Sequence, residues 1–216
     1  MISMNKNLSL IILSGVAMML LPACNGMFAG IYDEPETANE FGFTKPCSED
    51  TPGIIYINAT DYTRWTYINF ENSSIDTLSV DDEAPEKWDL AIHRYDAKTN
   101  GGSVAETTMT DISLSAKSGA TENLDYVDDE WTTTKIVTDM STMMDGYLSY
   151  AESFYNPVLS RWLNVDTSEM PPIYTPSGRV YILSTSDGRK AALKLQNYMD
   201  ASGVKGYMTI EYIYPL

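Results

Sequence analysis

The chain has little of what metal enzymes and nucleic-acid-binding proteins commonly need. Its 216 residues include one histidine, two cysteines and 14 basic side chains against 30 acidic ones, for a formal charge of −16. One histidine and two cysteines are too few for a zinc finger, a histidine-rich metal site or a disulfide framework. Contacts to nucleic-acid phosphates need a basic face, which an acidic chain does not supply. These shortages argue against nucleic acid as a partner and against most metal-dependent hydrolases.

Motifs of common catalytic sites are also missing. The sequence contains no nucleophile elbow, no metal-binding triad and no glycine-rich phosphate loop. With 30 acidic residues, some pair of carboxylates will lie at a spacing suited to glycoside hydrolysis by chance, so that signal carries no weight. We therefore expect a protein that is not an enzyme.

The N-terminus has the features of a targeting signal. Residues 8–21 form an apolar run preceded by Lys6, shorter than the roughly 20 residues of a transmembrane helix and typical of a secretory signal peptide. Residues 21–24 read Leu-Pro-Ala-Cys, which resembles a bacterial lipobox. The sequence thus predicts a lipoprotein signal peptide over residues 1–23 and a lipid anchor on Cys24. The alternative is an ordinary signal peptide with an incidental cysteine.

The segment after the signal peptide lacks a regular pattern. Residues 24–53 mix glycine, proline, asparagine and acidic side chains without a sustained period. This composition predicts a flexible tether between the lipid anchor and a folded domain. Cys47 lies in this segment and has no cysteine partner once Cys24 is acylated, so we expect a free thiol.

From residue 54 onward the chain has the composition of β-strands. Threonine, tyrosine, tryptophan, isoleucine and valine recur in short runs, separated by turn signals such as Asn100-Gly101 and Asp187-Gly188. Beyond the signal peptide no stretch has a long helical period, although residues 141–159 leave room for a short helical turn. The pattern predicts an all-β, mostly antiparallel domain over residues 54–216. Strands are expected at residues 54–57, 64–70, 88–95, 131–138, 162–165, 179–185, 190–198 and 207–214.

One segment is specific enough to indicate a family. Residues 88–96 read Trp-Asp-Leu-Ala-Ile-His-Arg-Tyr-Asp and strongly resemble the HmuY-like family of haem-binding lipoproteins from Gram-negative anaerobes. Residues 61–67, residues 179–181 and the tyrosine-rich end at 207–215 fit the same family. The resemblance spans residues 54–216 and implies a β fold likened to a right hand, with haem held between two finger-like hairpins.

The resemblance also implies a function in iron acquisition. Members of the family act as haemophores, which take haem from host haemoproteins and pass it to a TonB-dependent outer-membrane receptor. This implies a lipid-anchored protein of the outer membrane, exposed at the cell surface, with haem as its bound cofactor.

In its ligands the chain departs from the founding member of the family, which holds haem iron with two histidines. His93 is the only histidine here, and it lies within the signature segment rather than in a ligand segment. We expect His93 to be structural. Other family members are similar to this chain in using a pair of methionines, and the resemblance places the two ligand segments at residues 138–146 and 166–174.

These ligand segments are rich in methionine. The first contains Met140, Met143 and Met144, and the second contains Met170 beside two prolines. A thioether is a soft, neutral axial ligand of haem iron that, compared with imidazole, favours Fe(II). We expect Met170 on one side of the haem and Met143 or Met144 on the other, with Met140 as a weaker choice. The alternative is that the methionines fill gaps in a hairpin interface.

The surroundings of the haem can also be predicted in outline. Arg161 and Arg179 are candidates to pair with the propionates of haem, although ordinary surface roles are equally compatible with the sequence. The aromatic residues close to the ligand segments suit either the walls of a haem slot or core packing, and are Tyr147, Tyr150, Phe154 and Tyr174. The methionines expected in the core are Met109, Met199 and Met208.

A second function remains open on the sequence. Acidic β domains rich in tyrosine and tryptophan and held on a lipid tether also suit glycan binding or adhesion, because aromatic rings stack on sugars. That alternative predicts exposed aromatic side chains on one face and no change of absorbance with haem.

Overall fold

The structure, a computed structural model, describes residues 41–49, 51–117, 119–168 and 170–216. The predicted signal peptide and Cys24 lie outside these residues. Every strand pairing in the described part of the chain is antiparallel, so the prediction of an all-β, antiparallel domain is confirmed. No helix within these residues has the length and apolar character needed to cross a membrane.

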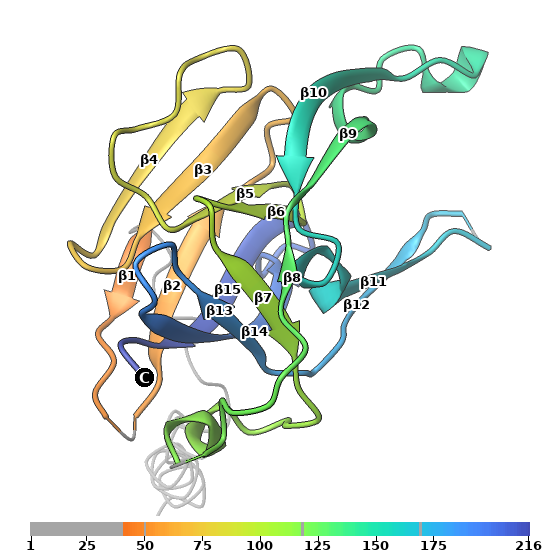
Figure 1. Cartoon of the computed structure of the whole chain (residues 1–216). Helices are drawn as coiled ribbons and strands as arrows, with labels where there is room; N and C mark the ends of the chain where they lie inside the picture. Colours follow the sequence, from red (N-terminus) through yellow and green to blue (C-terminus); the bar gives the residue numbers. More distant parts are fainter. Residues whose placement is uncertain (1–40, 50, 118, 169) are drawn as a thin grey trace, which may run out of the picture. The chain divides into compact units, whose positions relative to one another are not determined.

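The larger sheet has seven strands, in the order β1-β2-β15-β14-β13-β7-β8 (Figure 1). The last strand of the chain, β15, pairs with β2, so the beginning and the end of the domain meet inside this sheet. The strands are β1 (Gly42–Lys45), β2 (Gly53–Asn58), β7 (Ser103–Glu106), β8 (Val127–Asp128), β13 (Tyr181–Ser184), β14 (Lys190–Met199) and β15 (Lys205–Ile213).

The smaller sheet has four strands in the order β4-β3-β5-β6. These are β3 (Arg64–Asn69), β4 (Ser74–Ser79), β5 (Leu90–His93) and β6 (Asp96–Thr99). All of β5 and all of β3 after Arg64 are buried, because the main core lies between the two sheets and a second apolar cluster covers the other face of the smaller one. Trp162 is fully buried in the main core, and its indole N–H donates to the carbonyl of Tyr95 at 2.8 Å.

Two separate hairpins extend from the sheets on the same side of the domain (Figure 1). We call β9 (Glu130–Asp139) with β10 (Ser149–Tyr155) the first finger, and β11 (Leu163–Asp166) with β12 (Ile173–Pro176) the second finger. Short 3₁₀ segments complete the fold at η1 (Ile112–Ala116), η2 (Met143–Asp145) and η3 (Leu159–Trp162). Segment η2 lies within residues 141–159, where the sequence left room for a short helical turn, whereas most of η3 lies beyond them.

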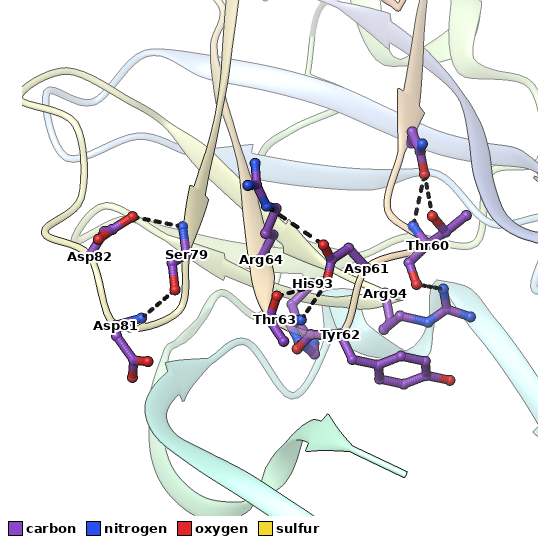
Figure 2. Close-up of polar contacts among 11 residues, drawn as sticks. Thr60, Asp61, Tyr62, Thr63, Arg64, Ser79, Asp81, Asp82, His93 and Arg94 are labelled. Atoms are coloured by element: carbon purple, nitrogen blue, oxygen red, sulfur yellow. Dashed lines mark hydrogen bonds and ion pairs between the residues drawn. The ribbon is translucent and has the colours of Figure 1, made fainter. Parts of the chain in front are cut away.

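The signature segment turns earlier than the sequence predicts. Lys98 lies in strand β6 instead of a turn, and the chain reverses at Arg94, whose φ is 55°. The Arg94 guanidinium donates to the carbonyl oxygen of Ala59 at 3.0 Å. It also donates to that of Thr60 at 2.8 Å (Figure 2), and both bonds support this left-handed residue. The Asn100-Gly101 turn connects β6 to β7, which belongs to the other sheet, so it does not join two paired strands.

Part of the segment expected to be a tether belongs to the fold. Strand β1 pairs with β2, and the Phe43 ring packs edge-on against Tyr212 with centroids 5.2 Å apart. Cys47 is a free cysteine, as expected, but its thiol donates to the carbonyl of Tyr214 at 3.2 Å. These contacts hold the start of the described chain against the sheet, because an apolar ring in this segment finds a buried partner.

Candidate functional site

The first finger is anchored at its base and free at its tip. Ile136 on β9 is fully buried in a cluster with Trp65 and Tyr67 of the smaller sheet. The pairing of β9 with β10 shifts register on both sides of that point, between Ser149 and Tyr150 toward the tip and between Ala151 and Ser153 toward the base. Such irregularities bend and twist a hairpin, so they set the direction in which the tip projects.

Polar side chains shape the turn at the tip of the first finger. The Asp139 carboxylate accepts hydrogen bonds from the Ser141 backbone N–H at 2.7 Å and the Ser141 hydroxyl at 3.0 Å, and these bonds lower the pKa of Asp139. Gly146 closes the segment in the left-handed region, with φ of 85°. Because polar groups form the turn, the methionines within it are not needed for packing.

Two of these methionines lie exposed at the tip. The exposed fraction of the residue is 40% for Met143 and 89% for Met144. Both belong to the 3₁₀ segment η2, which has about three residues per turn, rather than to a strand. Met140, at the end of β9, is partly buried.

The second finger presents one methionine at its tip. The pairing of β11 with β12 is regular, from Leu163 opposite Pro176 to Asp166 opposite Ile173. Leu163 at the base is buried, whereas Met170 in the connecting turn is 77% exposed. The two fingers therefore each carry exposed thioethers at the end farthest from their buried base.

The second finger is also attached to the larger sheet from the side. The Lys205 ammonium of β15 donates to the carbonyl of Pro172 at 3.1 Å and lies 4.3 Å from the centre of the Tyr174 ring. The Tyr174 ring stacks on Tyr198 with centroids 5.4 Å apart, and burial raises the pKa of Tyr174. Tyr174 is thus packed against the main core rather than free at the tip. Lys205 was missed in the sequence because an isolated lysine in a strand carries no signal.

Both arginines expected near the propionates have partners in the protein. The Arg179 guanidinium donates to the carbonyl of Thr108 at 3.0 Å. The Arg161 guanidinium lies 3.8 Å from the carboxylate of Glu106, and both side chains are substantially exposed. These contacts are of the weak, exposed kind that a ligand can replace.

His93 is a core residue, as expected. It is 1% exposed, and its Nε2 lies 2.7 Å from the carbonyl oxygen of Tyr62 (Figure 2). Its ring packs against Trp65, with centroids 5.3 Å apart, and burial lowers its pKa. A side chain enclosed in this way cannot reach the iron of an external haem.

Exposed methionines are confined to the fingers in the part of the chain that the structure describes. Met208 is fully buried, Met109 packs against a core cluster and Met199 is partly buried, close to what the sequence predicts for all three. Within the same residues no three histidine, cysteine, aspartate or glutamate side chains gather into a group suited to a metal ion. The finger tips therefore provide soft, neutral donors and nothing that resembles a hard-metal site.

Comparison with solved structures identifies close relatives. A protein from Bacteroides vulgatus described as HmuY-like and haem-binding is 53% identical, with a TM-score of 0.77 over 82% of this chain and 99% of its own. A protein from Bacteroides fragilis described as a lipoprotein is 52% identical, with a TM-score of 0.78 over 84% of this chain and 99% of its own.

A more distant relative has the same fold. The ligand-free HmuY analogue of Tannerella forsythia is 25% identical, with a TM-score of 0.64 over 74% of this chain and 94% of its own. No curated protein matches the chain. The family model for HmuY protein matches residues 61–212, well over half of the sequence. The chain therefore belongs to the HmuY family and has the HmuY-like fold that residues 88–96 led us to expect.

Proposed function

We propose that the protein is a haemophore that binds haem between the tips of its two fingers. Met170 ligates the iron from the second finger, and Met143 or Met144 ligates it from the first. The observation that carries this proposal is the distribution of methionines: in the described residues, those that are exposed lie at the two finger tips. Membership of the HmuY family and the haem-binding description of the B. vulgatus relative support haem as the ligand.

The thioether donors determine which oxidation state of the haem iron is bound more tightly. A thioether sulfur is neutral and soft, and it stabilises Fe(II) relative to Fe(III) compared with imidazole. It also carries no proton that must leave before it binds a metal, unlike a histidine, cysteine or carboxyl ligand. We therefore expect binding to be stronger under reducing conditions and to depend little on pH through its ligands.

The surfaces near the tips suit a flat, apolar ligand. Tyr147 and Tyr150 on the first finger and Ile173 on the second are exposed, and covering them would contribute about 25 cal/mol for each Å² of apolar area removed from water. Tyr174 on β12 supports this wall through its stack on Tyr198.

The propionates need either water or a cation, because the chain carries a formal charge of −16. Arg179 is our first candidate for the cation that pairs with a propionate, and Arg161 is the second. Each would exchange its present contact, with the Thr108 carbonyl or with Glu106, for a propionate oxygen.

We extend the proposal to the path of the haem. The protein is lipidated at Cys24, stands on the outer membrane at the cell surface, captures haem from host haemoproteins and passes it to a TonB-dependent receptor. The lipoprotein description of the B. fragilis relative supports the anchor. Ligands at projecting tips suit such a transfer, because a receptor can reach the haem without opening the core. The role is binding and transport rather than catalysis.

A titration of the mature chain with haem tests the proposal. Visible spectra are recorded in air and then with dithionite. We expect a saturable one-to-one complex with low-spin features and a higher affinity in the reduced state. If neither redox state gave a saturable change, haem would be removed as the ligand, and glycan binding would become the leading function.

A further inference from the structure

A pocket opens at the base of the first finger, away from the finger tips. Its volume is about 640 Å³, and its walls come from the β4–β5 connection, the β6–β7 turn, β8 and both strands of the first finger. None of the residues that line it belongs to the second finger or to residues 140–147 at the tip of the first. This pocket is therefore separate from the place proposed for haem.

Aromatic rings line the pocket and face solvent. Trp131 is 55% exposed and Phe154 is 50% exposed, and their rings pack edge to face with centroids 5.1 Å apart. Trp88 lines the same pocket and packs edge-on against the buried Tyr67. Large rings left in water at the mouth of a pocket offer flat, electron-rich faces to a ligand.

The floor of the pocket already holds one cation. The Lys98 ammonium lies 4.1 Å from the centre of the Trp65 ring, 5.4 Å from that of Tyr67 and 5.8 Å from that of Trp88, so Trp88 already has a cation over its face. Burial lowers the pKa of Lys98 to about 8, and the nearby Asp129 opposes that shift. Asp129 is internal as well, since it accepts hydrogen bonds from the Thr99 backbone N–H and the Asn156 amide. The positive charge of Lys98 and the negative charge of Asp129 thus largely offset each other beneath the rings.

The open side of the pocket is acidic. Asp82, Asp128 and Glu152 line it, and all three are exposed. Asp82 accepts a hydrogen bond from the Ser79 backbone N–H, whereas no hydrogen bond or ion pair within the described residues uses the carboxylates of Asp128 and Glu152. A ligand entering here meets aromatic faces together with negative charge, and an anion such as haem is repelled.

We propose that this pocket binds an organic cation: an ammonium or guanidinium group carried on an apolar stem. The exposed faces of Trp131 and Phe154 attract the cationic head through their ring quadrupoles, and the apolar stem covers the rest of these rings. Asp128 and Glu152 accept hydrogen bonds from the head. The same chemistry is found in free amines and in lysine or arginine side chains of another protein, and the probes below distinguish the two sources.

The test is a calorimetric titration of the mature chain with N-acetyl-arginine methylamide in 150 mM salt. The matched probe is the citrulline derivative, which has nearly the same shape without the charge. We expect saturable binding of the arginine probe only, weakening several-fold between 50 and 500 mM salt. A Gly-Arg-Gly peptide that binds more tightly than agmatine would identify a protein side chain as the source, and the reverse order would identify a free amine.

Variants locate the binding. Trp131→Ala and the double variant Asp128→Asn/Glu152→Gln should each weaken the arginine probe by about threefold or more. Glu49→Gln removes an exposed charge outside the pocket and should leave the affinity unchanged. Haem titrations of the same variants should match the unaltered protein, so this proposal and the haem proposal fail separately.

Three results would overturn the cation site. The citrulline probe could bind as well as the arginine probe, a neutral disaccharide could bind in place of both, or Glu49→Gln could weaken the arginine probe as much as the pocket variants do. Circular dichroism confirms that each variant is folded. The double carboxylate variant keeps side-chain size, so it remains informative if Trp131→Ala does not fold.

Discussion

The ammonium of Lys205 lies 4.3 Å from the centre of the Tyr174 ring, and it also donates to the carbonyl of Pro172 at 3.1 Å. Through this pair the larger sheet is joined to the second finger, close to Met170. Since Pro172 follows Met170 by two residues, the position of the exposed thioether depends on a lysine from a strand near the end of the chain.

Replacing this lysine should weaken haem binding without changing the ligands. In Lys205→Met the stem is kept and the donor is lost, so the tip is held less firmly and the affinity for ferrous haem should fall about three- to tenfold. The visible spectrum at saturation should stay the same. Lys194→Met is the matched control, because Lys194 also donates to a backbone carbonyl, that of Thr110, at 2.6 Å. An equal loss in both variants would show a general effect on stability.

Substitution of the methionines tests the ligand assignment directly. Met170→Ala should lower the affinity for ferrous haem at least tenfold and remove the low-spin spectrum, since the iron loses one axial ligand. The double variant Met143→Ala/Met144→Ala should do the same, and the two single variants show which residue ligates. Met208→Leu, at a buried position, serves as the control and should bind normally.

Substitution of His93 tests the ligand assignment in the opposite sense, because the haem spectrum should not change. Because its ring is buried and bonded to the Tyr62 carbonyl, His93→Gln should lower stability but leave the haem spectrum unchanged. A folded His93→Gln protein that lost the spectrum would contradict the methionine ligands.

Stability should depend on pH through Asp96. Burial raises the pKa of Asp96 to about 7, although Lys135 and a hydrogen bond from Ser160 oppose the shift. The folded state therefore holds a proton that the unfolded chain releases near pH 4, so this group lowers the unfolding free energy as pH rises from about 4 to about 7. We expect Asp96→Asn to gain on the order of 1–3 kcal/mol relative to the unaltered protein between pH 5 and pH 8.

Urea unfolding at both pH values measures this gain. His93, whose pKa is lowered by burial, acts with the opposite sign, but it is present in both proteins and cancels in their difference. Asp76→Asn, at an exposed position on β4, should show no such gain. A constant difference between Asp96→Asn and the unaltered protein across this range would refute the assignment.

Gly206 should not tolerate a side chain. Its φ is 105°, and a Cβ atom there would lie 2.6 Å from the Arg94 guanidinium and 3.0 Å from the Ala59 carbonyl oxygen. Gly206→Ala should therefore destabilise the fold by roughly 2–4 kcal/mol. Gly178 also has a positive φ, 70°, but nothing lies near its Cβ position, so Gly178→Ala should cost only about 1 kcal/mol. Equal losses in chemical denaturation would mean that crowding at Gly206 is relieved by movement.

Local patterns predict eight of the 15 strands in the described residues and miss β1, β4, β6, β7, β8, β10 and β12, and they do not predict which strands pair. The Asp187-Gly188 turn joins β13 to β14 as expected, because neighbouring strands of one sheet need only a tight turn. The Asn100-Gly101 turn looks equivalent in sequence, yet β7 pairs with β13 in the other sheet, where Val104 is buried. Packing of the strand that follows, rather than the turn itself, decides between the two outcomes.

The features of the candidate site also fall into those that the sequence predicts and those that it does not. The methionine-rich segments could be located from the sequence through the family resemblance, and the structure adds that Met143, Met144 and Met170 are exposed. The contacts of Lys205 and Lys98 could not be predicted. Each joins side chains from strands far apart in the sequence, and a lysine in a strand is usually a solvated surface residue.

The exposure of the finger tips also makes their methionines the most easily oxidised of those that the structure describes. Met144 and Met170 are open to peroxide, whereas Met208 is sealed in the core. Conversion of a thioether to a sulfoxide makes the side chain polar and is reversible only by a dedicated reductase. Peroxide would therefore modify the proposed ligands while the fold stayed intact, and the proposed capacity to carry haem would depend on repair rather than on refolding.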